Sequence, residues 1–376
     1  MTALSPPQSE ALETIIRNIV APQALETDTQ GRFPRQAVTA LGQAGLLGLV
    51  SATAVGGAGG GLPQARAVVE RLAQDCSSTA MVVCMHYCAT AVLEQFGSDA
   101  VRREIAAGRH LSTLAFSEAE SRSHFWAPVS TASARGDLVV LDARKSWVTS
   151  AVEADSYVWS SQPLKAEGAS SLWLVSSKAA GLSVAGTFDG LGLRGNASSP
   201  ITAQGVAVQA RDLLGEDGKG FDTMMGVVLP WFVSLNAACS VGLMEGALSR
   251  AIAHVSGTRH QHLNTGLADL PTIRAYLARG RIRTDMARAL LDDTLAAMAT
   301  QRPDTMLRVL EIKVAAAESA LEVTDLAMRV CGGAAFRKEA GIERLFRDAR
   351  AANVMAPTSD VLYDFIGKAI TGQALF

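Results

Sequence analysis

The chain has 376 residues, with 34 lysines and arginines against 36 aspartates and glutamates and 48% hydrophobic residues. This length exceeds one ordinary hydrophobic core, so two or three packed domains are expected. The net charge of −2 provides no basic stripe for a phosphate backbone, which argues against a nucleic-acid partner. The apolar runs at 224–235 and 237–248 are short or interrupted, which argues against a membrane span.

The first thirty residues carry four acidic side chains and no basic segment followed by an apolar run. We therefore expect no signal peptide and a cytoplasmic location. The five cysteines are odd in number and lack paired metal spacing, which predicts reduced core thiols and no metal site. Cys84 and Cys88 lie one helical turn apart, but their neighbours are Val, Met and Ala.

Three zones of different periodicity follow one another along the chain. Residues 1–110 carry apolar residues at helical spacing and predict an N-terminal helical domain. Residues 111–219 contain short β-type runs separated by turns and predict a compact antiparallel barrel or sandwich. Residues 220–376 predict a C-terminal four-helix bundle, with helices near 222–257, 270–298, 305–331 and 349–371. The expected fold is mainly α with an inserted β-domain, and flat cofactors tend to bind at such domain junctions.

A glycine-rich run at 56–61 could be mistaken for a phosphate-binding loop. It has no strand before it and no Lys followed by Ser or Thr after it. We interpret it as a flexible loop between helices.

The stretch 143–151 lies between two β-type runs and contains Trp147, one of five tryptophans, with Thr149 two residues later. In an extended strand these two side chains project from the same face. An aromatic plane beside a hydroxyl can hold a flat heterocycle and hydrogen-bond its edge. The alternative is an ordinary strand with a core Trp and a surface Thr.

Several other stretches carry recognisable patterns in a fixed order over about residues 30–370. They are GLLGL at 45–49 with VGGAG at 55–59, SSTA at 77–80 leading to His86, FSE at 116–118, KSWVTSA at 145–151, LGLRG at 191–195, LGEDGKGF at 214–221, GG at 332–333 and RDAR at 347–350. In this order they resemble the acyl-CoA dehydrogenase superfamily of flavoproteins. The resemblance implies helical, β and four-helix domains that hold FAD, in a homotetramer or homodimer.

The resemblance also implies positions for the flavin ring. The ring would lie against Trp147, with Phe116, Ser117, Thr149 and Ser150 around its pyrimidine edge. Donors at that edge stabilise negative charge on a reduced flavin.

The FAD diphosphate and adenine are implied to lie near a second group of residues. Arg259 would reach the diphosphate of a neighbouring subunit, and Gly332, Gly333 and Thr358 would lie close by. The alternatives are an ordinary helix-end arginine and, for the glycine pair, a helix C-cap.

The reaction implied by the resemblance is α,β-desaturation of an acyl-CoA thioester, in which a carboxylate removes the α-proton. Ala356 occupies the usual position of that carboxylate. In some relatives the base instead lies on the first helix of the bundle, next to an arginine. Phe232 and Val233 occupy these two positions here.

Three residues are weak candidates for a replacement base, namely Asp360, Glu120 and His124. Asp360 follows Ala356 by one helical turn and could point into the bundle or to solvent. Glu120 and His124 lie in the loop after Phe116, where a solvent-facing position is the alternative.

That same loop departs from the family motif Thr-Glu-Pro-x-x-Gly-Ser-Asp. Residues 117–124 read SEAESRSH, so Arg122 replaces Gly and His124 replaces Asp. The resemblance makes Ser123 a contact of the pantetheine arm. Arg122 would narrow the substrate site or offer a charge to an anionic substrate, unless the loop is a drifted surface loop.

Three functions remain open from the sequence. The leading one is an FAD-dependent oxidoreductase that acts on an acyl-CoA thioester, with an electron-transfer flavoprotein as a candidate partner. The second is a flavin monooxygenase, N-hydroxylase or other non-desaturating enzyme on the same fold, for which no α-proton base is needed. The third is a non-catalytic binding or assembly subunit that retains the flavin.

Overall fold

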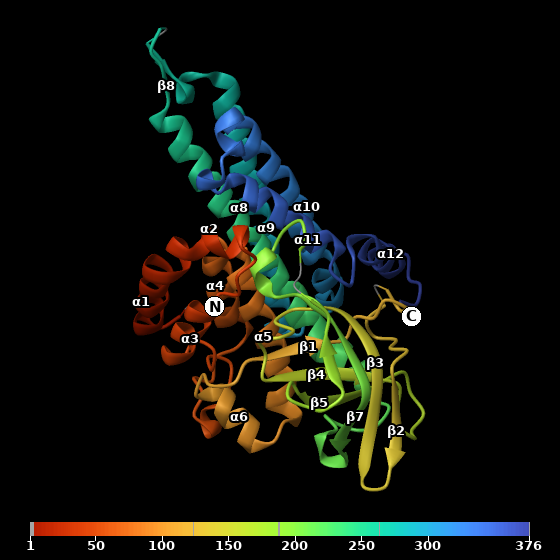
Figure 1. Cartoon of the computed structure of the whole chain (residues 1–376). Coiled ribbons are helices and arrows are strands. Elements are labelled where there is room, and N and C mark those ends of the chain that lie inside the picture. Colours follow the sequence, from red (N-terminus) through yellow and green to blue (C-terminus); the bar gives the residue numbers. More distant parts are fainter. Residues whose placement is uncertain (1–3, 123, 187–188, 263, 376) are drawn as a thin grey trace.

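Helices, then strands, then helices follow one another along the chain in this computed structural model (Figure 1). The structure describes residues 4–122, 124–186, 189–262 and 264–375. Ser123, an expected substrate contact, therefore lies outside the described residues.

The N-terminal domain is helical, as predicted. Its helices are α1 (Pro6–Ile15), α2 (Ala21–Thr29), α3 (Arg35–Gln43), α4 (Leu62–Ala73), α5 (Ser77–Phe96) and α6 (Asp99–Ala106). Helix α5 is apolar on almost every side and buried over most of its length, so it forms the centre of this domain. It contacts α4, the long helix α8 (Leu229–Gly257) of the C-terminal domain and the strand β1 (Ser112–Ala115).

The glycine run at 56–61 is a loop between helices, as predicted, but it is held by backbone hydrogen bonds. Gly57 donates to Ala52 at 3.0 Å, Gly59 to Ser51 at 2.8 Å and Gly60 to Leu49 at 2.9 Å. The five cysteines are buried and free of disulfides, which confirms the prediction of core thiols.

The middle domain consists of two sheets that share one core. The strands are β1 (Ser112–Ala115), β2 (Thr131–Arg135), β3 (Leu138–Val148), β4 (Ser156–Ser161), β5 (Ser171–Ser176), β6 (Leu182–Val184) and β7 (Ser199–Gln209). One sheet has the order β1-β4-β5 and the other β2-β3-β7-β6. Trp159 and Trp173 of the first sheet pack with Leu141 and Ile201 of the second.

Of the predicted barrel or sandwich, the structure has the sandwich, with no closed barrel among the described residues. One detail of the β prediction is wrong, because the domain is not wholly antiparallel and β1 pairs in parallel with β4. Between these two strands the chain forms the β2–β3 hairpin in the other sheet, so it returns to the first sheet in the same direction.

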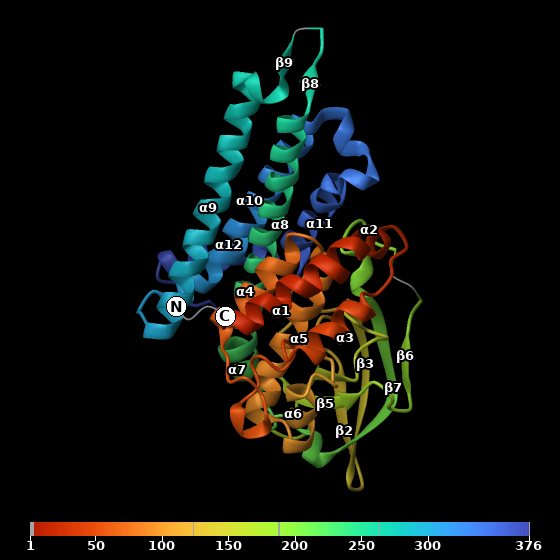
Figure 2. The same cartoon turned by 90° about the vertical axis from the view of Figure 1, so that its left-hand side faces the viewer.

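The C-terminal domain is again helical. Its helices are α7 (Gly220–Thr223), α8 (Leu229–Gly257), α9 (Pro271–Thr300), α10 (Thr305–Cys331), α11 (Ile342–Val354) and α12 (Ser359–Ile370). A small hairpin of β8 (Arg259–His260) and β9 (Thr265–Gly266) projects beyond the helices, away from the β-domain (Figures 1 and 2).

The helical segment Gly220–Gly257 agrees with the helix predicted near 222–257. By length and composition it is the one helix among the described residues that could cross a membrane. Its most apolar window is 89% buried inside the protein, as in the core helix of a globular domain.

The fourth helix of the predicted bundle, near 349–371, is broken into α11 and α12 by residues 355–358. Pro357 has no N–H to continue the helix and disfavours the helical conformation of Ala356 before it. Thr358 then caps α12, its hydroxyl accepting a hydrogen bond from the N–H of Val361.

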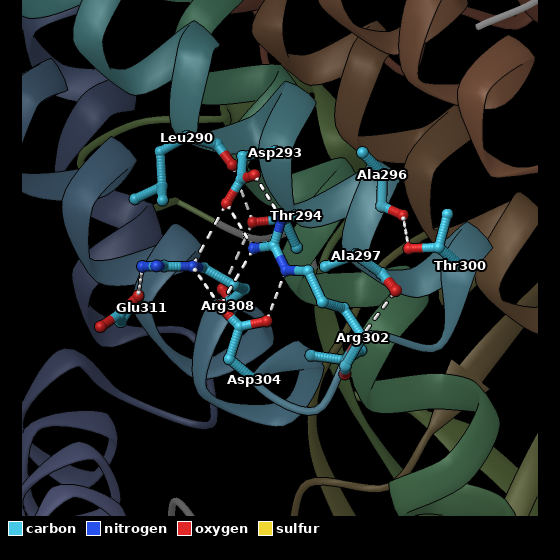
Figure 3. A network of polar contacts seen from close by, with 11 residues as sticks. Leu290, Asp293, Thr294, Ala296, Ala297, Thr300, Arg302, Asp304, Arg308 and Glu311 are labelled. Atoms are coloured by element: carbon cyan, nitrogen blue, oxygen red, sulfur yellow. Dashed lines mark hydrogen bonds and ion pairs between the residues drawn. The ribbon is translucent and has the colours of Figure 1, made fainter.

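Ion pairs close the turn between α9 and α10 (Figure 3). Both terminal nitrogens of Arg302 pair with the carboxylate of Asp293 at 2.8 Å, and its Nε pairs with Asp304 at 2.5 Å. Arg308 binds Glu311 at 2.8 Å from the next turn. These contacts fix where α10 begins, and α10 carries a buried lysine described below.

Candidate functional site

A cavity of about 800 Å³ lies where the β-domain meets the C-terminal helices. The β-domain supplies residues that follow β1 and end β3, together with the turn at 190–193. The first turn of α8 supplies Val228, Leu229 and Phe232. The break between α11 and α12 supplies Met355, Ala356 and Thr358. The cavity is therefore walled by segments that are far apart in the sequence.

Trp147 lines this cavity in an unusual conformation. Its φ is +56°, which is rare for a bulky residue, and its side chain is 67% exposed. Backbone strain of this kind costs about 1–3 kcal/mol and concentrates at ligand sites. The surrounding structure therefore holds the exposed Trp147 side chain at the cavity wall at an energetic cost.

Thr149 lines the same cavity but is only 4% exposed. The expectation that Trp147 and Thr149 share one face of an extended strand is wrong in detail. The left-handed Trp147 interrupts the pleat and β3 ends at Val148. The two side chains reach one cavity through this bend, and Ser150, with φ of +59°, continues it.

Four serine and threonine residues on the cavity wall have a hydroxyl without a hydrogen-bond partner among the described residues, namely Ser117, Ser146, Thr149 and Ser198. Phe116 lines the same cavity, with its ring stacked on Phe125 at 6.3 Å between centroids. An exposed aromatic side chain beside such hydroxyls fits a flat heterocycle with a polar edge. The residues present therefore fit an isoalloxazine ring.

Glu118 is the one carboxylate among the described residues of the cavity wall, and it is committed to an ion pair. Lys145 Nζ lies 2.5 Å from Glu118 Oε1 and also donates to the Ser160 carbonyl at 2.7 Å. The second Glu118 oxygen accepts from the N–H groups of Val129 at 2.7 Å and Ser130 at 3.1 Å.

Burial shapes the protonation of this pair. It lowers the pKa of Lys145 to about 8, despite the opposing effect of Glu118. Burial alone would raise the pKa of Glu118. The charge of Lys145 and the hydrogen bonds to the carboxylate have a larger opposite effect, so the pKa of Glu118 is lower than usual. Glu118 is thus held as a carboxylate that is fully hydrogen-bonded, which makes it a poor proton acceptor.

The turn at 190–193 is fastened to α11. Asp348 Oδ1 accepts from the Leu193 N–H at 2.6 Å, and Arg347 donates to the Leu191 carbonyl at 2.8 Å. Burial raises the pKa of Asp348 to about 6. Leu191 itself is largely exposed and lines the cavity. This turn and α11 therefore form one continuous wall.

The structure brings together seven of the residues that the sequence singled out. These are Phe116, Ser117, Arg122, Trp147, Thr149, Ala356 and Thr358, all on the cavity wall. Ser150 is buried outside it, and its N–H donates to the Asn196 carbonyl at 2.9 Å. Arg259 lies on the projecting hairpin, and Gly332 and Gly333 follow the end of α10. Their expected contacts with FAD stay predictions.

None of the three candidate bases lines the cavity. Asp360 is exposed in the first turn of α12, and Glu120 faces a separate shallow hollow beside β3 and β7. His124 is exposed and packs edge-on against Trp126, with 5.1 Å between ring centroids. Within the described chain, the cavity thus holds no unpaired carboxylate.

The sequence reasoning missed several wall residues, chiefly Met85, Asn196, Leu229 and Arg350. A signal existed for Arg350, which follows Arg347 by three residues and so shares its helical face. Met85 and Leu229 come from helices that periodicity alone assigns to a core.

Three family models match successive parts of the chain. The acyl-CoA dehydrogenase N-terminal domain matches residues 8–108, the middle domain 113–206 and the C-terminal domain 218–371. A probable acyl-CoA dehydrogenase of Bacillus subtilis, YngJ, is 26% identical over 360 residues, covering 94% of each chain. A short-chain-specific acyl-CoA dehydrogenase of Clostridium acetobutylicum is 25% identical over 352 residues, covering 92% of each.

Solved structures have the same fold. Butyryl-CoA dehydrogenase from Megasphaera elsdenii superposes with a TM-score of 0.90 at 22% identity, over 99% of this chain and 100% of that one.

Proposed function

Because this chain belongs to the acyl-CoA dehydrogenase family of FAD-dependent oxidoreductases, we propose that it oxidises the CH–CH bond of an acyl thioester. The observation that carries the proposal is the cavity itself. It joins the exposed Trp147 side chain and four hydroxyls to an apolar wall from α8 and the α11–α12 break. A flavin and an alkyl chain would therefore lie side by side in it.

Each wall has a separate task in this proposal. When bound, FAD supplies an acceptor for a hydride. The Trp147 indole offers the ring a face, and the hydroxyls of Ser117 and Thr149 hydrogen-bond its polar edge. Leu229 and Phe232 shield the reacting carbons from water, which strengthens electrostatic interactions in the cavity.

Desaturation needs a group that accepts the α-proton, and this requirement distinguishes the proposed function from a second candidate function. Ala356 stands at the position where the family resemblance places the base, and Glu118 is occupied by Lys145. A cavity without a free carboxylate favours flavin chemistry that removes no α-proton, such as oxygenation or N-hydroxylation. We keep that as the second candidate function.

We also propose a homodimer or homotetramer in the cytoplasm, with an electron-transfer flavoprotein as electron acceptor. The position of Arg259 supports the assembly. The hairpin that carries Arg259 projects beyond the helices, away from the β-domain (Figure 1). Its guanidinium would meet an FAD diphosphate only in another copy.

The test is anaerobic mixing of the purified protein with saturated acyl-CoAs of increasing chain length. Loss of the visible flavin absorbance supports thioester oxidation. No loss with any chain length, together with oxygen uptake driven by NADH or NADPH, favours the second candidate. Protein that is colourless and takes up no added FAD contradicts both.

A further inference from the structure

Three guanidinium groups line the cavity, those of Arg122, Arg347 and Arg350. Arg347 is fully engaged, because it pairs with Asp28 at 2.6 Å and with Glu343 at 2.6 Å. Its charge is therefore neutralised within the protein.

Arg122 and Arg350 differ from Arg347 in this respect. Neither guanidinium has a carboxylate partner or a hydrogen bond among the described residues, and both side chains are exposed. Arg350 lies with its guanidinium carbon 5.7 Å from the centre of the Phe346 ring, a contact that leaves its N–H groups free. The backbone of Arg122 has a φ of +50°, which is uncommon for a long side chain.

The rest of the wall does not balance these two charges. Its one described carboxylate, Glu118, lies 2.5 Å from Lys145 and contributes no net negative charge. The residues between Arg350 and Thr358 on the wall are apolar, among them Val354 and Met355. The cavity therefore carries two uncompensated cations in a largely apolar surface, which favours an anionic ligand.

The two arginines come from different parts of the chain and line the same cavity. Arg122 belongs to the loop that follows β1, and Arg350 to α11 in the C-terminal domain. Guanidinium groups bind carboxylate and phosphate oxygens through paired N–H groups, with more geometric selectivity than lysine.

We propose that Arg122 and Arg350 form an anion subsite for the substrate, which binds a carboxylate on the acyl group or a phosphate of the thioester carrier. This inference rests on the proposed function in assuming a thioester ligand. It adds a substrate class, since a carboxylate at the far end of a short acyl chain would select acidic acyl groups over neutral ones.

The experiment compares R122M and R350M with wild type and with R135M, an exposed arginine at the end of β2 outside the cavity wall. FAD content is measured first. Dissociation constants are then measured anaerobically for butyryl-CoA and succinyl-CoA, which differ by one terminal carboxylate. The N-acetylcysteamine thioesters of both acyl groups lack the carrier phosphates and complete the set.

We expect R122M and R350M to weaken succinyl-CoA binding about tenfold and butyryl-CoA binding less than about twofold, with R135M unchanged. That result identifies the acyl carboxylate as the anion. Equal loss for both CoA esters, with both N-acetylcysteamine esters unchanged, identifies the carrier phosphates instead and also supports the subsite.

Other outcomes overturn the subsite. One is that R122M and R350M bind every thioester as wild type does. A second is that R135M weakens binding as much as they do. A third is that R122M and R350M lose FAD but bind thioesters normally once FAD is restored. The last would show that the arginines serve the flavin. If wild type binds thioesters but its flavin absorbance does not fall, only the proposed oxidation is refuted. The subsite proposal is judged separately, from the ratios of the dissociation constants of variant and wild type.

Discussion

Lys313 on α10 donates a 2.8 Å hydrogen bond to the carbonyl of Pro357, in the break between α11 and α12. The same ammonium donates to the carbonyls of Ala352 at 2.6 Å and Met355 at 3.0 Å. The side chain is fully buried, and burial lowers its pKa to about 7. Lys313 thus fixes the segment that presents Ala356 and Thr358 to the cavity.

K313M is expected to destabilise the protein by about 3 kcal/mol, because three buried carbonyls lose their donor. Urea unfolding measures this loss. K368M, which removes a partly exposed lysine paired with Asp364 on α12, is the control and should cost less than about 1 kcal/mol. An equal cost for the two variants would contradict the positioning role of Lys313.

The pH dependence of this effect has a definite sign. The pKa of Lys313 is about 7 in the folded protein, against about 10.4 for an unfolded lysine. Between these values the unfolded chain holds more protons, so this group makes stability rise with pH. K313M lacks the contribution, and its deficit relative to wild type should widen from pH 7 to about pH 10. A deficit that narrows would refute the assignment.

W147A is expected to weaken FAD retention by about 30-fold, corresponding to about 2 kcal/mol of lost stacking and burial. The ratio of flavin to protein absorbance after gel filtration, over a series of dilutions, reports the change. W147F retains an aromatic face and should lose much less. Unchanged FAD content in W147A would remove the stacking assignment.

Breaking the buried pair of Lys145 and Glu118 is expected to cost about 3–5 kcal/mol for either K145M or E118Q alone. The double variant K145M/E118L should be more stable than either, since it leaves no unpaired buried charge. The lowered pKa of Glu118 gives stability that is present above its unfolded pKa and is lost as the pH falls through its folded pKa. E118Q should therefore show a weaker acid dependence than wild type in thermal unfolding.

A356E introduces a carboxylate at the point where the family resemblance places the base. If thioester oxidation is limited by proton removal, flavin bleaching by an acyl-CoA should accelerate by at least about tenfold. FAD content should stay unchanged, and A356Q separates charge from size. Equal or slower bleaching in A356E than in A356Q would show that proton removal at this position does not limit the reaction.

The order of the domains could be predicted from the sequence because periodicity is a local property. Helical spacing marked α5, α8 and α10, and clustered short runs marked the β-domain. The parallel pairing of β1 with β4 could not be predicted, since it depends on the path of the β2–β3 hairpin in the other sheet. The break at Pro357 was missed although proline is a local signal, because apolar periodicity continues on both sides of it.

The residues of the cavity wall were predicted better than the proton chemistry. Phe116, Ser117, Trp147 and Thr149 do line one cavity, although a backbone bend and not strand alternation brings the last two together. Asp360 was a candidate because of its spacing from Ala356. That spacing assumed one continuous helix, and the break places Asp360 in a new first turn facing solvent.

Arg347 touches all three domains. It holds Asp28 on α2, the Leu191 carbonyl in the β-domain and Glu343 on its own helix, at distances of 2.6 to 3.0 Å. The three units are therefore coupled thermodynamically through one side chain. A chimaera that exchanges a single domain with a relative would separate these partners, so Asp28, the 190–193 turn and α11 need to be transferred together.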